Sequence, residues 1–151
     1  MSKHVVYDNI SWHTETDDFP PEVPRENAGI HMCVFLSWML NNDLHSDSFN
    51  SQNTAFIEDI KGQRTKPIDF LVNAFNEEIR DEYFTEEGNR FAEHYYSSSK
   101  YFKDYAGLLG RDTLTIYHVK DPWKVYEVVE PIIDQRFSDW KKGKKPWQFW
   151  K

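Results

Sequence analysis

The sequence has one cysteine, few glycines and no long apolar run. Its single cysteine, Cys33, cannot form a disulfide within the chain, which favours a reducing compartment. Six glycines form no phosphate-binding loop, and no GxSxG elbow is present. No stretch approaches the roughly 20 apolar residues that span a bilayer, and the first residues lack a signal-peptide pattern. We therefore expect a cytoplasmic protein that does not enter membranes.

Aromatic and acidic residues are abundant instead. Tyr, Trp and Phe make up 17% of the 151 residues, which is enough to build a sizeable core. The net charge is -7, although residues 141–151 (KKGKKPWQFWK) carry five lysines and no acid. Without those lysines the rest of the chain has a net charge of -12. Such a body should repel nucleic acid and anionic membranes and attract basic partners.

The apolar pattern predicts a mainly α fold, or α+β with at most a short strand or hairpin. Helical spacing covers residues 26–41, 85–109 and 122–140, and shorter helices are expected at 54–61 and from Pro67. Helix 26–41 is apolar on most sides, which is typical of a buried central helix, with Trp38 in the core. Pro131 should kink or divide the last helix.

The organisation along the chain is simple. Residues 113–119 suit a short strand or an extended connection, because they are rich in β-branched and aromatic residues. The length fits one compact domain. We expect a single globular helical domain over residues 1–140, followed by a basic aromatic tail at 141–151.

One candidate site is a group of histidines and carboxylates. The group consists of His13, Glu15, Asp17, Asp18 and His31. Imidazole and carboxylate groups are common ligands of zinc and related ions, and a loop bearing His13 could fold over the start of the helix that carries His31. Their spacing matches no established metal motif. Hydrogen-bonded structural histidines and no cofactor are therefore expected, and the alternative is a small metal-dependent enzyme that uses His13, Glu15 and His31.

Cys33 and His31 do not form a nucleophile and its base. Residues two apart on a helix point about 200° apart, given roughly 100° per residue. A thiolate nucleophile needs a base within hydrogen-bond reach. We expect Cys33 to be a small core residue.

A second candidate site is an acidic segment, residues 77–87. Its acids are Glu77, Glu78, Asp81, Glu82, Glu86 and Glu87, with Arg80 as the cation among them and the aromatic Tyr83 and Phe84 inside. The segment suits either a solvated helix end followed by a capped helix start, or a surface for a basic partner. The lysine-rich tail likewise suits either packing onto this acidic body or binding to single-stranded nucleic acid or a membrane interface.

Several separated strings resemble a family of uncharacterised bacterial proteins, a domain of unknown function. The strings are YDNISWHTETDDFP, ENAGIHMCVFLSWML, FTEEGNRFAEHYY, YHVKDPWKVYE and IIDQRFSDWK. The resemblance implies no reaction, cofactor or catalytic residue. Small acidic bacterial domains of this kind often look like immunity proteins encoded beside secreted toxins, which is an analogy.

The sequence therefore predicts a protein-binding module, of the bacterial immunity type, that neutralises a cognate toxin by direct binding. The expected binding residues are Glu77, Glu78, Asp81, Glu82, Tyr83, Glu86 and Glu87. The expected partner is the toxin or another basic protein, with no nucleic acid and no membrane, and the chain is expected to be a monomer or a small homo-oligomer. A non-catalytic structural protein is a further alternative.

Overall fold

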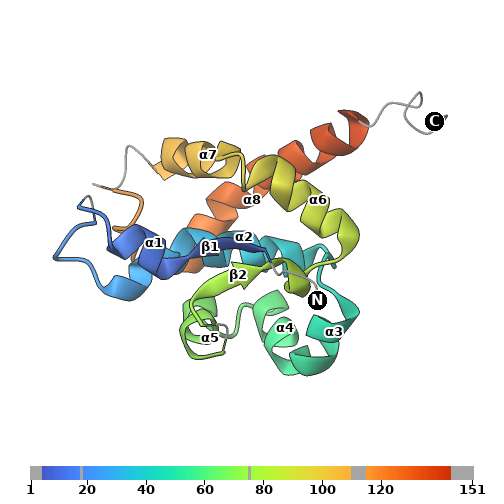
Figure 1. Cartoon of the computed structure of the whole chain (residues 1–151), viewed down its shortest axis with the longest axis horizontal. Coiled ribbons are helices and arrows are strands. Elements are labelled where there is room, and N and C mark those ends of the chain that lie inside the picture. Colours follow the sequence, from blue (N-terminus) through green and yellow to red (C-terminus); the bar gives the residue numbers. More distant parts are fainter. Residues whose placement is uncertain (1–4, 18, 75, 110–114, 144–151) are drawn as a thin grey trace.

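The computed structural model describes residues 5–17, 19–74, 76–109 and 115–143, and most of them are helical (Figure 1). The α-helices are α1 (Ile10–Thr14), α2 (Ile30–Asn41), α3 (Asp47–Gln52), α4 (Thr54–Lys61), α5 (Pro67–Ala74), α6 (Glu86–Tyr95), α7 (Lys100–Leu109) and α8 (Pro122–Gly143). Two 3₁₀ helices, η1 (Arg25–Gly29) and η2 (Asp81–Tyr83), and two strands, β1 (Val6–Asn9) and β2 (Glu78–Arg80), complete the described elements. The predicted mainly α class with at most a hairpin is confirmed.

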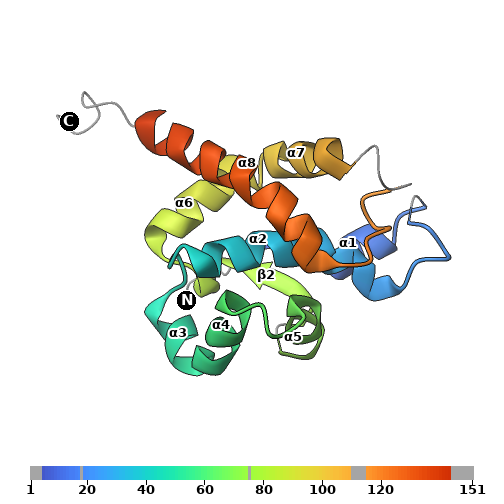
Figure 2. The same ribbon diagram turned by 180° about the vertical axis from the view of Figure 1, so that it is seen from behind.

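Helix α2 is the centre of the fold. Every residue from 30 to 40 is buried, and α2 contacts α8 on one side and α4 and α5 on the other (Figures 1 and 2). Trp38 is fully buried, and its indole N–H donates to Asp134 Oδ1 of α8 over 2.8 Å. The prediction of a buried central helix with Trp38 in the core is confirmed. The segment before Ile30 differs from the prediction, because it is the 3₁₀ helix η1.

Gly29 joins η1 to α2 at a close approach. A Cβ atom at this position would lie 2.8 Å from Cδ1 of Ile10 and 2.9 Å from Cδ1 of Ile68. Both contacts are shorter than van der Waals distance, so a larger residue would push apart the two side chains that pack here. Glycine at this point lets α1 and α5 close on the start of α2.

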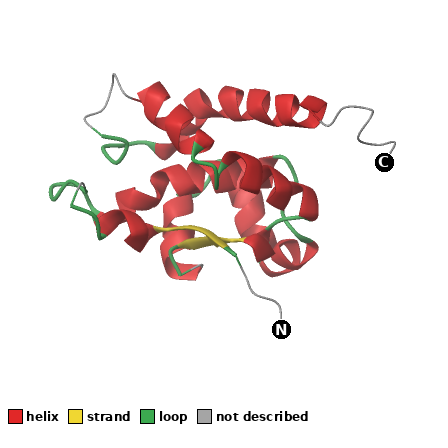
Figure 3. Ribbon diagram, turned by 45° about the horizontal axis from the view of Figure 1, so that its top comes forward, coloured by secondary structure: helices red, strands yellow, loops and turns green. Residues whose placement is uncertain are grey.

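Helices α6, α7 and α8 lie on one side of α2 (Figure 1), and Figure 3 shows the two short strands, in yellow, among the helices, in red. The Phe91 ring lies 5.4 Å from that of Trp38, 4.9 Å from that of Phe137 and 5.5 Å from that of Trp140, measured between centroids. Aromatic contacts of this kind bury large areas. They join α2, α6 and α8 into one core.

The predicted helix over 85–109 is two helices. Thr85 caps α6 as expected, since its hydroxyl accepts from the Gly88 N–H over 3.0 Å. The helix then stops at Tyr95, and Ser99 has a φ of 69° before α7 begins at Lys100. A left-handed residue cannot continue a right-handed helix. The run of serines at 97–99 is where the chain turns.

Helix α8 begins where the sequence predicted. The Asp121 carboxylate accepts from the Trp123 N–H over 3.1 Å, which satisfies a free donor of the first turn. Pro131 does not divide the helix, which continues to Gly143. The first three residues of the expected tail therefore belong to α8, and residues 144–151 lie outside the described part.

The predictions for the remaining elements are partly confirmed. The helices over 54–61 and from Pro67 are confirmed as α4 and α5, with Phe75 outside the described residues. Of the two interpretations of residues 113–119, the short strand is wrong for 115–119, which form a turn and a connecting loop, and residues 113–114 are not described. α1, α3 and β2 were missed. None of the described helices is long and apolar enough to cross a bilayer.

Candidate functional site

The first site is centred on Asp8 of β1. This strand pairs antiparallel with β2, which places Asp8 opposite Ile79, and the Asp8 side chain is buried. Asn9 then caps α1, because its side-chain oxygen accepts from the Ser11 N–H over 2.8 Å. The short helix α1 returns His13 towards Asp8 one turn later. Strand, cap and helix thus fix the two residues in one local unit.

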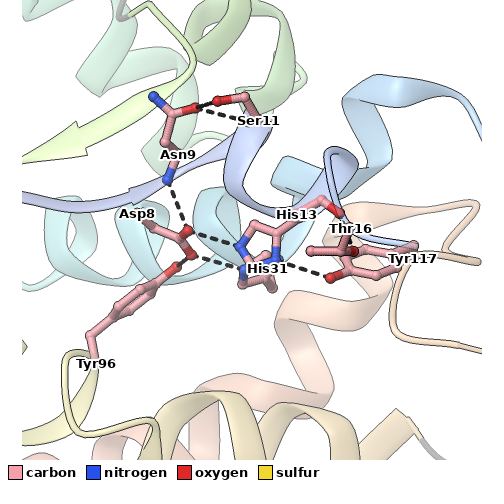
Figure 4. Close-up of polar contacts among 8 residues, drawn as sticks. All are labelled: Asp8, Asn9, Ser11, His13, Thr16, His31, Tyr96 and Tyr117. Carbon is pink, nitrogen blue, oxygen red and sulfur yellow. Dashed lines mark hydrogen bonds and ion pairs between the residues drawn. The ribbon is translucent and has the colours of Figure 1, made fainter. Parts of the chain in front are cut away.

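Asp8 accepts hydrogen bonds from three side chains, one on the neighbouring helix α1 and two from segments far away in the sequence (Figure 4). His13 Nε2 of α1 lies 2.8 Å from Asp8 Oδ1, and His31 Nε2 of α2 lies 3.0 Å from Oδ2. The Tyr96 hydroxyl, just after α6, donates to the same Oδ2. We call Asp8, His13 and His31 the Asp8 centre. It ties β1, α1 and α2 together.

The charges of the Asp8 centre follow from these bonds. Burial alone would raise the pKa of Asp8, but hydrogen bonds from His13 and His31 outweigh it and hold the pKa well below its usual value. Burial lowers the pKa of His31 although Asp8 opposes the shift. An ionised carboxylate only accepts hydrogen bonds, so both histidines carry a proton on Nε2 in this arrangement.

The outer nitrogens of the two histidines differ. His13 Nδ1 lies 3.0 Å from the Tyr117 hydroxyl. His31 Nδ1 is buried and has no partner among the residues described, and the same holds for the hydroxyl of Tyr105, whose ring lies 5.9 Å from that of His31. The exposed Phe102 stacks on His13, with ring centroids 6.3 Å apart.

The structure brings together two of the three residues in the predicted metal alternative. His13 and His31 meet, whereas Glu15 is exposed at the C-terminus of α1 and Asp17 is also exposed. Asp18 lies outside the described residues. The carboxylate at the centre is Asp8, which the sequence interpretation missed. A possible signal was its position inside the apolar string VVYDNI, where a carboxylate must find partners when the strand is buried.

Cys33 is not part of a reactive site. It is fully buried within α2, and burial raises the pKa of its thiol well above the usual value. A buried, protonated thiol is a weak nucleophile. The structure therefore agrees with a small core residue.

The acidic segment forms β2, η2 and the first turn of α6, where the sequence predicted a helix end and a helix start. Its acids pair with four cations, of which Arg80 is the one inside the segment. The pairs are Glu77 with Arg25, Glu78 and Glu82 with Arg80 (2.9 and 3.2 Å), Glu86 with Arg90 (2.5 Å) and Glu87 with Lys141 (3.3 Å). Lys141 also lies 4.9 Å from the centre of the Phe137 ring, one turn earlier on the same helix α8.

A surface pocket of about 590 Å³ adjoins the acidic segment between α3 and η2. Its lining combines the hydroxyl and amide groups of Ser46, Ser48, Gln52 and Asn53 with the Phe49 and Tyr83 rings and the charged Arg80 and Glu82. The two rings pack with centroids 5.2 Å apart, and burial raises the pKa of Tyr83 to about 12. Two of the predicted binding residues, Glu82 and Tyr83, therefore line one pocket.

Fold and site together define a mainly α domain with a buried histidine–carboxylate centre and a polar pocket beside an acidic segment. The chain belongs to the family described as Domain of unknown function (DUF7832), whose model matches residues 6–119. The expected membership of an uncharacterised family is confirmed. No curated protein and no solved structure matches the chain. The matched residues include the Asp8 centre and the whole acidic segment.

Proposed function

We propose that this protein is a binding module for a basic protein, and that the partner is the toxin of an immunity pair. The observation that supports this proposal is the pocket lined by Glu82 and Tyr83 beside the acidic segment. A pocket gives a partner side chain a defined place to be buried, and buried anchors supply most of the energy of protein interfaces.

The pocket suits the basic side chain of a partner. The Glu82 carboxylate offers a charged acceptor, Ser46 and Asn53 add neutral hydrogen-bonding groups, and the Tyr83 ring offers a flat face. A guanidinium or ammonium group gains from each of these contacts. Arg80 already binds Glu82 over 3.2 Å, so an incoming cation would share or replace this pair.

The ion pairs of the acidic segment do not prevent this role. The side chains of Glu86 and Arg90 are 80% and 60% exposed. Exposed pairs contribute only about 0–1 kcal/mol, because water and salt screen them. A partner's cations can therefore replace the Glu86–Arg90 pair at little cost, and the acidic body would still speed the association.

The immunity role adds a reason for the acidic surface. Many toxins act on nucleic acids and carry a basic substrate groove, and an acidic inhibitor can occupy such a groove by imitating the substrate's charge. A net charge of -7 for the chain fits that mode of binding and opposes direct binding of nucleic acid.

The experiment measures binding between the purified chain and the purified protein encoded beside it. We expect direct association, and rescue of cells that express that protein when the chain is coexpressed. A neutralised variant, Glu82→Gln/Glu86→Gln/Glu87→Gln, should associate at least about 10-fold more slowly at low salt, with a smaller difference at high salt.

The matched control is Glu22→Gln/Glu26→Gln/Glu127→Gln. It removes three exposed charges from other surfaces, so it changes the net charge by the same amount. A pocket-filling variant, Gln52→Trp, should weaken binding, whereas Lys103→Trp on α7 should not. Equal association rates for the two triple variants would remove the acidic segment from the binding surface.

A further inference from the structure

We infer that the Asp8 centre is a binding site for one divalent transition-metal ion, held by Asp8, His13 and His31. Each residue offers one ligand atom, and the three atoms lie within 4.8 Å of one another. Two imidazoles and a carboxylate are a donor set used by open zinc sites and by mononuclear iron(II) sites.

The donor atoms are close together, although the distances are those of hydrogen bonds. A donor atom lies about 2.0–2.2 Å from zinc, so two neighbouring donors at angles of about 90–110° are about 2.8–3.6 Å apart. His13 Nε2 lies 2.8 Å from Asp8 Oδ1, and His31 Nε2 lies 3.0 Å from the other oxygen, Oδ2. One ion bound by both imidazoles and one carboxylate oxygen therefore needs a rotation of these side chains, which starts from ligand atoms that all lie within 4.8 Å of one another.

Binding requires a change of tautomer in each histidine. In the hydrogen-bonded arrangement each Nε2 carries a proton, and as a metal ligand Nε2 must be bare. In each ligand imidazole the ring proton then resides on Nδ1. In His13, Nδ1 can then donate to the Tyr117 hydroxyl 3.0 Å away, which is the outer contact that orients a metal-binding histidine.

Three protein ligands leave a further coordination position. Asp8 and His31 have side-chain exposures of 8% and 1%, whereas His13 is 17% exposed, so the centre reaches solvent on the His13 side. Open metal sites place a water or another small ligand in this position. Mg²⁺ prefers oxygen ligands in octahedral geometry, so the two imidazoles select against it.

The test uses the full, untagged chain, because a histidine tag would bind metal itself. Zn²⁺, Fe²⁺ without oxygen, and Mg²⁺ are each titrated in competition with a chromophoric chelator, and bound metal is counted by elemental analysis. We expect about one Zn²⁺ or Fe²⁺ per chain and no competition from Mg²⁺. A folded chain that binds neither ion overturns the inference.

Variants locate the site. His13→Ala should weaken binding more than about 100-fold, because loss of an outer contact alone costs about 10–100-fold. His94→Ala, an exposed histidine on α6, should leave it unchanged and serves as the control for adventitious binding. Equal affinity in the two variants overturns the inference.

A second variant decides the matter if His13→Ala does not fold. Tyr117→Phe keeps the ring and removes only the hydroxyl next to His13 Nδ1. The expected loss of affinity is about 10–100-fold. Circular dichroism checks the fold of each variant, and unchanged affinity in a folded Tyr117→Phe protein counts against the site.

Discussion

The Asp8 centre and the acidic segment both contain carboxylates, but their surroundings differ. Asp8 is 6% exposed and accepts from three side chains of different elements, together with the Asn9 N–H over 2.8 Å. Glu86 in the acidic segment is 80% exposed and pairs with one arginine four residues later. The same functional group, a carboxylate, is therefore held in a fixed position at Asp8, whereas at Glu86 its cationic partner can be exchanged.

The difference shows which part of the charge supports the fold and which part remains for a partner. A buried carboxylate must be satisfied mainly by the protein itself, because it has little contact with water. An exposed carboxylate is satisfied by water with or without its cation.

Trp38→Ala should cause the largest loss in the free energy of unfolding, because it truncates a large, uncharged side chain in the core. Trp38 is fully buried, and it contacts Phe91 and Phe137 as well as Asp134. Truncation of a buried aromatic costs about 3–5 kcal/mol. Urea denaturation followed by circular dichroism measures the loss, and a loss below about 1 kcal/mol would contradict the central position of α2.

Asp8→Ala should destabilise the metal-free protein by about 3 kcal/mol. The change leaves the donors of His13, His31 and Tyr96 without their acceptor, and each buried orphan costs about 1–3 kcal/mol. Urea denaturation with a chelator present measures this. The control is Asp47→Ala at the exposed start of α3, for which a loss of about 0.5 kcal/mol is expected. Similar losses in the two variants would abolish the contrast between buried and exposed carboxylates.

Asp104→Asn tests an intermediate case. Asp104 accepts from Tyr95 over 2.6 Å and from Arg136 over 2.8 and 3.0 Å. Burial raises its pKa, but the bonds from Arg136 and Tyr95 outweigh burial, and the folded pKa is below the ordinary 3.8. The wild-type advantage, about 1.5–3 kcal/mol, should therefore be full at neutral pH. It should shrink as the pH falls below 3.8 through the lowered pKa. An advantage that grows on acidification would contradict the sign of this shift.

Glu86→Gln should have the smallest effect. The residue lies in the first turn of α6, where a negative charge is worth about 0.3–1 kcal/mol. We expect a loss of about 0.5 kcal/mol that decreases in high salt, measured by thermal unfolding at two salt concentrations. A loss comparable to that of Asp8→Ala would mean that the acidic segment supports the fold.

Helix α2 was predictable from the sequence because its signal is local. Residues 30–40 are nearly all apolar, and a helix that is apolar on all sides must be surrounded by other elements. The starts of α6 and α8 were also predictable, since Thr85 and Asp121 are capping residues directly before the helices.

The split between α6 and α7 was hidden because aromatic residues keep helical spacing across the break. Tyr95 and Tyr101 both face the core, with centroids 5.6 Å apart, although the chain turns between them. Strand β2 was hidden for the opposite reason. Of its three residues only Ile79 is buried, and the charged Glu78 and Arg80 flank it.

The Asp8 centre was half predictable. The residue types of His13 and His31 pointed to a site, but the choice of carboxylate depended on tertiary structure. Glu15 is nearer to His13 in sequence, yet it lies at the exposed end of α1, whereas strand pairing with β2 places Asp8 inside. Sequence proximity therefore favoured Glu15, which the structure leaves outside the Asp8 centre.

Helix α8 has a consequence for where the protein can be cut. The family match ends at residue 119, before α8 begins, yet Val125, Val129 and Ile133 of α8 are buried in the common core. A chain shortened to residues 6–119 would expose the α8-facing side of α2 to water. Exposed apolar surface of that kind promotes aggregation. We therefore expect the smallest autonomous folding unit to extend beyond the family boundary and to include α8 at least as far as Ile133.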